Sequence, residues 1–98
     1  MILNVYSIFD QAANAFIQPF FLQTDGLAIR AFSGNVNSKE PNNISENPEQ
    51  FTLIKIATFD DSTGHMTPLE QHETIAKALT LQEKETIKYQ TLQQCSKK

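Results

Sequence analysis

The chain has 98 residues, of which 40% are hydrophobic, a composition that suits one small domain and excludes two independent cores. Its formal net charge of −3 argues against a strongly cationic surface dedicated to nucleic acid. Cys95 is the only cysteine and Asp10 interrupts the N-terminal apolar stretch, so we expect a soluble intracellular protein without disulfide, signal peptide or membrane span.

The first predicted elements are strands. Residues 2–8 are β-branched and aromatic with apolar residues on both faces, which predicts a strand inside a sheet. The polar residues 10–14 predict an irregular or helical turn. Residues 16–23 predict a second strand, either at an edge or broken at Pro19, because proline cannot donate a ladder hydrogen bond.

A helix follows, capped by Thr24 or Asp25 and running to about Asn37. Gly34 weakens this helix and is a candidate for its early end. Its expected apolar face consists of Ala28, Ile29, Phe32 and Val36.

Residues 38–50 hold two prolines and three asparagines and predict a loop. Residues 51–59 are the strongest strand signal in the chain. Strict alternation places Lys55 on one face with Phe51, Leu53, Ala57 and Phe59. Ile54 and Ile56 lie on the other face, and we expect both to be buried.

The segment Asp60-Asp61-Ser62-Thr63-Gly64 predicts a hairpin turn, followed by a short returning strand over residues 65–67. Thr67-Pro68-Leu69-Glu70 has the pattern of a capping box with proline at the first helical position, and so predicts a helix start. The expected apolar face of that helix is Leu69, His72, Ala76 and Leu79. Thr80-Leu81-Gln82-Glu83 resembles a second capping box.

Together these elements predict an α+β fold: a small, mainly antiparallel sheet with one packed helix and helical C-terminal elements. Residues 1–79 form the compact domain with an internal loop at 38–50, and residues 80–98 form a helical or frayed, lysine-bearing tail. Apolar residues on both strand faces, in so short a chain, favour a homodimer.

The residues give no pattern of a catalytic centre. The pair Asp60 and Asp61 lacks the ligand spacing of a calcium loop, and His65, His72 and Cys95 lack the spacing of a zinc site. No nucleophile elbow or phosphate-binding glycine loop is present in the sequence. We therefore expect no enzyme activity, no catalytic residues, no cofactor and no bound metal.

Two features bear on nucleic acid. The phenylalanines could form a base-stacking platform, but with so few other large hydrophobic residues we expect them to pack in the core. Arg30 lies near the start of the predicted helix. It either contacts a phosphate or serves no binding role, in which case it pairs with Asp25 or extends into solvent. The candidate DNA-binding cations are Arg30, Lys55, Lys84 and Lys88.

Several short blocks occur in a specific order and spacing between Val5 and Gly64. They are Val5-Tyr6-Ser7 with Asp10, Pro19-Phe20-Phe21, Gly26-Leu27-Ala28-Ile29-Arg30-Ala31-Phe32, Asn47-Pro48-Glu49, Phe51-Thr52-Leu53 and Phe59-Asp60-Asp61-Ser62-Thr63-Gly64. In these blocks the chain resembles the small nonstructural protein of gokushoviruses, single-stranded DNA phages of the Microviridae. It departs from that family at Ala57, where a glycine is frequent, and the region past Leu79 carries no resemblance.

The resemblance implies a nonstructural role in viral DNA replication or single-stranded genome packaging, in the host bacterial cytoplasm. One hypothesis is a DNA-binding or accessory module that contacts single-stranded DNA, with Arg30 as the one functional residue carried by a matching block. The alternative is a protein-interaction factor acting on the replication initiator, the procapsid or a host protein without contacting DNA.

Overall fold

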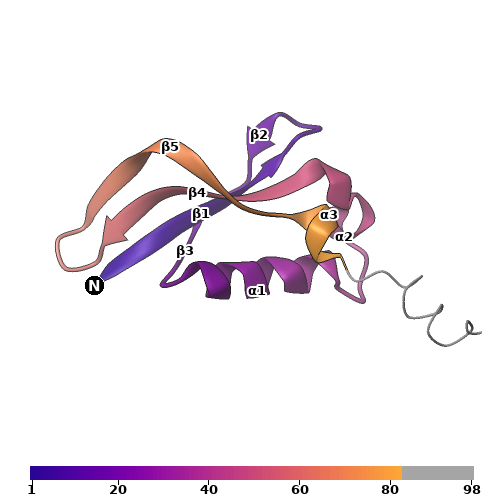
Figure 1. Ribbon diagram of the computed structural model, residues 1–98, viewed down its shortest axis with the longest axis horizontal. Coiled ribbons are helices and arrows are strands. Elements are labelled where there is room, and N and C mark those ends of the chain that lie inside the picture. Colours follow the sequence, from indigo (N-terminus) through magenta and orange to yellow (C-terminus); the bar gives the residue numbers. More distant parts are fainter. Residues whose placement is uncertain (83–98) are drawn as a thin grey trace, which may run out of the picture.

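The computed structural model describes residues 1–82, which form five strands and three short or medium helices (Figure 1). The strands are β1 (Ile2–Asp10), β2 (Ala15–Phe16), β3 (Phe20–Leu22), β4 (Phe51–Asp60) and β5 (His65–Lys77). The helices are α1 (Asp25–Val36), α2 (Asn43–Glu46) and α3 (Ala78–Leu81), with a 3₁₀ turn, η1, at Pro48–Gln50. The predicted α+β class with a mainly antiparallel sheet is confirmed.

Strand β1 lies inside the sheet, as predicted. It pairs with β4 along one side, and with β2 and β3 at its two ends along the other side, while β5 pairs with the far side of β4. The predicted break at Pro19 is also confirmed, because β2 ends at Phe16 and β3 begins at Phe20. Every pairing is antiparallel.

Helix α1 begins where the sequence predicts. The Oγ1 atom of Thr24 accepts a hydrogen bond from the Leu27 amide at 3.2 Å, and so caps one of the unpaired amides of the first turn. Gly34 does not end the helix, which continues to Val36, with Asn37 as its C-cap. The buried residues of α1 are Ala28, Phe32 and Val36, while Ile29 is half-buried.

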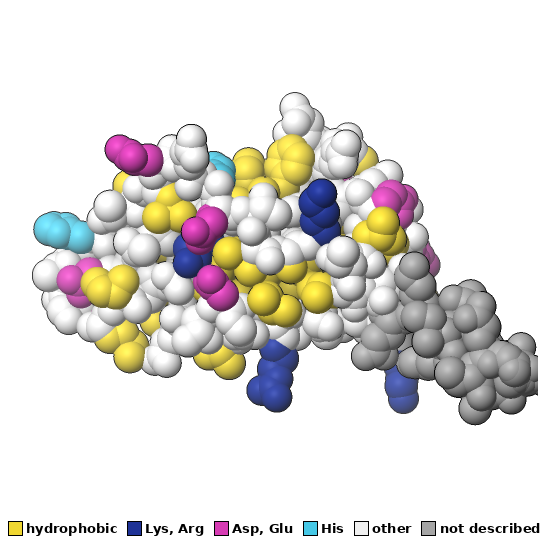
Figure 2. Space-filling model, viewed as in Figure 1, with side chains coloured by type: hydrophobic (Ala, Val, Ile, Leu, Met, Phe, Trp, Pro, Cys, Tyr) yellow, Lys and Arg dark blue, Asp and Glu magenta, His cyan; other side chains and the backbone are white. Residues whose placement is uncertain are grey.

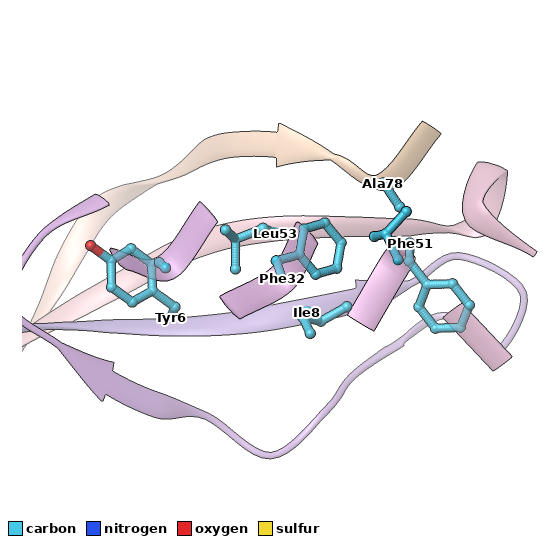
Figure 3. Packing of buried hydrophobic residues seen from close by; sticks show 8 residues of the cluster. Tyr6, Ile8, Phe32, Phe51, Leu53 and Ala78 are labelled. Atoms are coloured by element: carbon cyan, nitrogen blue, oxygen red, sulfur yellow. The ribbon is translucent and has the colours of Figure 1, made fainter. Parts of the chain in front are cut away.

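One hydrophobic core lies between α1 and the sheet (Figure 3). Strands β1 and β4 contribute Tyr6 and Ile8, and Phe51 and Leu53, respectively. Phe32 of α1 points into this layer, and Ala78 of α3 closes it at one end (Figure 3). In Figure 1, α1 runs along one side of the sheet, and the turn between β1 and β2 rises on the other.

The predicted loop at 38–50 contains more structure than its composition indicates. Asn42 and Ser45 form a reciprocal capping box around α2: each side chain accepts a 2.9 Å hydrogen bond from the other residue's amide. The turn η1 then leads directly into β4.

The helix predicted from Thr67 is wrong, because β5 occupies residues 65–77. Thr67 pairs with Thr58, and Pro68 pairs with Ala57. The hairpin turn itself is confirmed, with Gly64 at a φ of +80° and Asp60 Oδ1 accepting from the Ser62 amide at 2.9 Å. Cross-strand pairing therefore overrides the local capping signal, and Pro68 is tolerated because β5 is an edge strand.

The second predicted capping box is wrong as well. Helix α3 begins at Ala78, and the Thr80 hydroxyl donates to the Lys77 carbonyl at 2.7 Å from within the helix instead of capping it. Leu79, expected on an apolar helix face, is 49% exposed. Cys95 and residues 83–98, which make up most of the predicted tail, lie outside the described residues.

A bulge at Ile56 accounts for the error in the predicted faces of β4. Val5 pairs with Ala57, but the next residue of β1, Tyr6, pairs with Lys55, so Ile56 is an extra residue. The bulge shifts the alternation by one position, so Leu53 faces α1 while Ala57 lies on the other face. Ile54 and Ile56 are only half-buried, and the prediction that both lie in the core is wrong.

Candidate functional site

A polar network lies at the edge of the core where α1 begins; we call it the Tyr6 network. The Tyr6 hydroxyl donates to Asp25 Oδ1 at 2.6 Å, and Lys55 Nζ lies 3.2 Å from the same oxygen and 3.3 Å from Glu73 Oε1. The Asn4 amide donates to the Tyr6 hydroxyl at 3.1 Å. The network thus joins the first turn of α1 to β1, β4 and β5.

The pKa values follow from these contacts. Burial, and then the bond to Asp25, raise the pKa of Tyr6 to about 12. The Tyr6 hydroxyl, followed by Lys55, lowers the pKa of Asp25. Burial lowers the pKa of Lys55, but the hydrogen bonds that its ammonium donates to Asp25 and Glu73 outweigh this effect, and the pKa is raised. All three groups therefore keep their usual charge states near neutral pH.

The structure brings only some of the predicted site residues together. Lys55 lies in the Tyr6 network, where two carboxylates compensate its charge. Arg30 is exposed on α1, and none of the ion pairs within residues 1–82 includes it. Asp25, its predicted alternative partner, contacts Tyr6 and Lys55 instead. Lys84 and Lys88 lie outside the described residues, and the DNA-binding role of all four cations stays a prediction.

The sheet face opposite α1, which we call the outer face, carries aromatic side chains. Paired residues of an antiparallel ladder share a face, so Val5, Phe21 and Ala57 all lie here. The rings of Phe21 and Phe59 meet edge to face at 5.3 Å, and Met66 pairs with Phe59. Phe21 is 41% exposed and Met66 is 50% exposed.

A second aromatic group lies near β2. The rings of Phe9 and Phe16 are 5.0 Å apart, and Phe16 meets His72 of β5 edge to face at 5.6 Å. Phe16 is 46% exposed. The expectation of core packing is therefore correct for Phe32 and Phe51, which are 1% and 4% exposed, and wrong for Phe16 and Phe21.

Figure 2 shows the molecule in the view of Figure 1, with α1 along the lower side. In Figure 2, hydrophobic side chains gather in the middle of this view, and acidic and basic side chains lie next to one another beside them. No group of three or more potential metal ligands is assembled within residues 1–82. In the same part of the chain, no helix has the length and apolar character needed to cross a membrane.

Sequence reasoning did not find the Tyr6 network. Its signal was a lone lysine, Lys55, in the middle of an apolar strand, because such a charge needs partners when its stem is covered. The sequence presents Asp25 as a helix cap or as a partner of Arg30, and Glu73 falls within a predicted helix that does not form. The register that brings Glu73 opposite Lys55 depends on the bulges, which alternation does not reveal.

The fold and this site define a small α+β protein with a helix packed on one sheet face and partly exposed aromatic residues on the other. Residues 3–81 match the family described as Phage ORF5 protein, and the chain belongs to this family. It is therefore a phage protein, and the matched region extends from β1 to α3. No curated protein and no solved structure matches the chain.

Proposed function

We propose that this chain is a non-enzymatic accessory protein in DNA replication or single-stranded genome packaging of a gokushovirus, acting in the cytoplasm of the host bacterium. The phage family supports the viral setting, and the resemblance described above supports the narrower role. The outer face is the proposed binding surface. The observation that carries this choice is the exposure of Phe16, Phe21 and Met66 on one sheet face.

Charge favours a protein partner over direct DNA binding by the folded part. Residues 1–82 contain four Lys or Arg against nine Asp or Glu, a net charge of −5. One of those four cations, Lys55, is already paired with two carboxylates. A surface of this charge repels phosphates, whereas aromatic side chains and methionine are enriched at protein interfaces. The proposed partners are the replication initiator, the procapsid or a host protein.

A second candidate is direct contact with single-stranded DNA. Exposed phenylalanines on an antiparallel sheet provide stacking surfaces for unpaired bases, and the outer face has two such groups. Of the predicted cations, Arg30 and Lys55 lie on the helix side of the sheet, and Lys84 and Lys88 lie outside the described residues.

Capture of the tagged full chain from infected cells, with and without nuclease, separates the two candidates. We expect a viral or host protein to be retained after nuclease, and to be lost from the Phe21→Ala variant. Leu27→Ala is the matched control, since Leu27 is 42% exposed but lies on α1. Loss of the partner after nuclease would support the DNA mode, and equal capture by both variants would contradict the outer face as the surface.

A further inference from the structure

A hollow of about 530 Å³ opens at the far end of the sheet from the β4–β5 hairpin turn. It is lined by the last residue of β1, the first residue of β4, the C-terminal part of α1 and the start of α2. This volume lies within the range of small-molecule sites, about 300–1,000 Å³. None of the lining residues belongs to the Tyr6 network or to the two aromatic groups of the outer face. Ile17, which follows β2, does line the hollow.

The polar lining consists of three asparagines and one aspartate: Asn35, Asn42, Asn43 and Asp10. Asn42 is committed to the fold, since its amide nitrogen donates to the Asn35 carbonyl at 3.3 Å and its oxygen caps α2. The side-chain amides of Asn35 and Asn43 make no hydrogen bond within residues 1–82. Two amides, each with donors and an acceptor, therefore remain available to a ligand.

Among the lining residues within 1–82, Asp10 alone carries a charge. Its Oδ1 accepts from the amides of Ala12 and Ala13 at 3.0 and 3.3 Å, which fixes the carboxylate, while Oδ2 has no partner among the described residues. An anionic group inside the hollow would face this carboxylate, and no lining residue within 1–82 is a cation that could compensate it. The chemistry therefore favours a neutral ligand that donates hydrogen bonds.

Apolar side chains complete the walls. Phe51 is almost fully buried, Ile44 is half-buried and packs against the core, and Ile17 is 42% exposed. Such walls suit the faces of a flat ring, while the amides and the carboxylate suit its polar edge. Carboxylates accept from the amino group of cytosine, and asparagine pairs with the edge of adenine.

We propose that this hollow binds a nucleoside whose base carries an exocyclic amino group, cytidine or adenosine. Asp10 accepts from that amino group, Asn35 and Asn43 bind the rest of the polar edge, and the sugar extends toward solvent. This goes beyond the proposed function, because a nucleoside needs neither the outer face nor a protein partner.

The test is an NMR titration of the full chain with cytidine, adenosine, uridine and thymidine at millimolar concentration. Uridine and thymidine are matched probes because they have a carbonyl in place of the amino group. We expect about tenfold tighter binding of cytidine than of uridine, the effect of one charge-assisted hydrogen bond. Backbone shifts should be confined to the lining residues.

Two variants locate the site. Asn43→Ala should weaken cytidine binding several-fold, and Asp10→Asn should abolish the preference for cytidine over uridine, because an amide in place of the carboxylate can donate to the uridine carbonyl. Gln18→Ala, at an exposed position that does not line the hollow, is the control. Thermal unfolding checks that each variant is folded.

The proposal would be overturned if none of the four nucleosides binds, or if cytidine and uridine bind equally. Unchanged cytidine binding by folded Asn43→Ala would overturn it as well. None of these outcomes depends on whether a protein is captured from infected cells. Failure here is therefore distinct from failure of the proposed function.

Discussion

The Tyr6 hydroxyl donates a 2.6 Å hydrogen bond to Asp25, and this contact ties the interior strand of the sheet to the first turn of α1. Asp25 lies beside the positive end of the helix dipole, so its carboxylate is stabilised from two directions. Lys55 then links the same carboxylate to Glu73 of β5. Three elements distant in the sequence thus meet at one oxygen atom.

Substituting Tyr6→Phe tests this link. The ring stays in the core, but the hydrogen bond to a charged acceptor is lost, and we expect the free energy of unfolding to fall by about 1–2 kcal/mol. The value is at the low end for a charged partner because the Asp25 side chain is 44% exposed. Urea unfolding followed by circular dichroism measures it. A variant as stable as the wild type would show that the bond is not stabilising.

The raised pKa of Tyr6 predicts a loss of stability in alkali. The unfolded chain releases the tyrosine proton near the ordinary value of 10.0, whereas the folded protein retains it to about 12. The folded state therefore binds more protons between these values, and the free energy of unfolding decreases as the pH rises through this window.

Tyr6→Phe should remove the part of the decrease in the free energy of unfolding that comes from Tyr6. Urea unfolding of both proteins at pH 9 and in the window above pH 10 measures this difference. The Tyr89→Phe variant leaves Tyr6 as the only tyrosine, so its ultraviolet absorbance reports the titration of Tyr6 directly. A midpoint near 10 in the folded protein would contradict the buried, hydrogen-bonded phenol.

The bulge at Ile56 predicts unequal costs for two neighbouring residues of β4. Leu53→Ala removes a fully buried side chain and should lower the free energy of unfolding by about 2–5 kcal/mol. Ile54→Ala, at a half-buried position, should cost clearly less. Denaturant midpoints of the two variants provide the comparison, and a larger effect at Ile54 would restore the alternation expected from sequence.

Direct DNA binding predicts a defined dependence on salt. Each phosphate contact on a single strand contributes a slope of about −0.7, so contacts from Arg30, Lys55, Lys84 and Lys88 would give about −3. Neutral substitutions at Lys84 and Lys88 should make the slope shallower by about one to two. Fluorescence anisotropy of a labelled oligonucleotide measures the slope. Absence of binding at low salt would leave only the protein-partner mode.

A homodimer is the remaining expectation, and a dimer contact on the outer face would compete with the proposed partner for that surface. We expect light scattering at micromolar concentration to give twice the chain mass, and Phe21→Asp to return the protein to a monomer, because it places a charge on the apolar contact surface. A monomeric wild type would contradict the dimer, and a dimeric Phe21→Asp variant would place its interface elsewhere.

The sequence predicted the elements whose signals are local. Thr24 at the start of α1, Pro19 between two strands and Gly64 in the hairpin each act through their own backbone, and all three are where the structure has them. Elements decided by distant contacts were missed. The Thr67–Glu70 segment has the chemistry of a helix start, yet its pairing with β4 makes it a strand.

The same distinction holds for the site. Lys55 and Arg30 were found as cations, but what surrounds Lys55 depends on register. Lys55 pairs with Tyr6 because Ile56 is an extra residue relative to β1. It pairs with Glu73 because β5 has a larger bulge, residues 69–72, on the other side. No periodicity of the sequence reports these shifts, so the compensation of its charge was not predictable.

Ile56 has a consequence for the motions of the sheet. The pairing register shifts at this residue in both ladders. Toward β5, Lys55 pairs with Glu73 and Ala57 pairs with Pro68, so residues 69–72 lie unpaired with β4 between these two positions. The strand is thereby divided into a half anchored through Leu53 and a hairpin arm that begins at Ala57 and has no helix beneath its tip (Figure 1). The arm can open without disrupting the core, so its amides should exchange with solvent at a lower free energy than those beside Leu53.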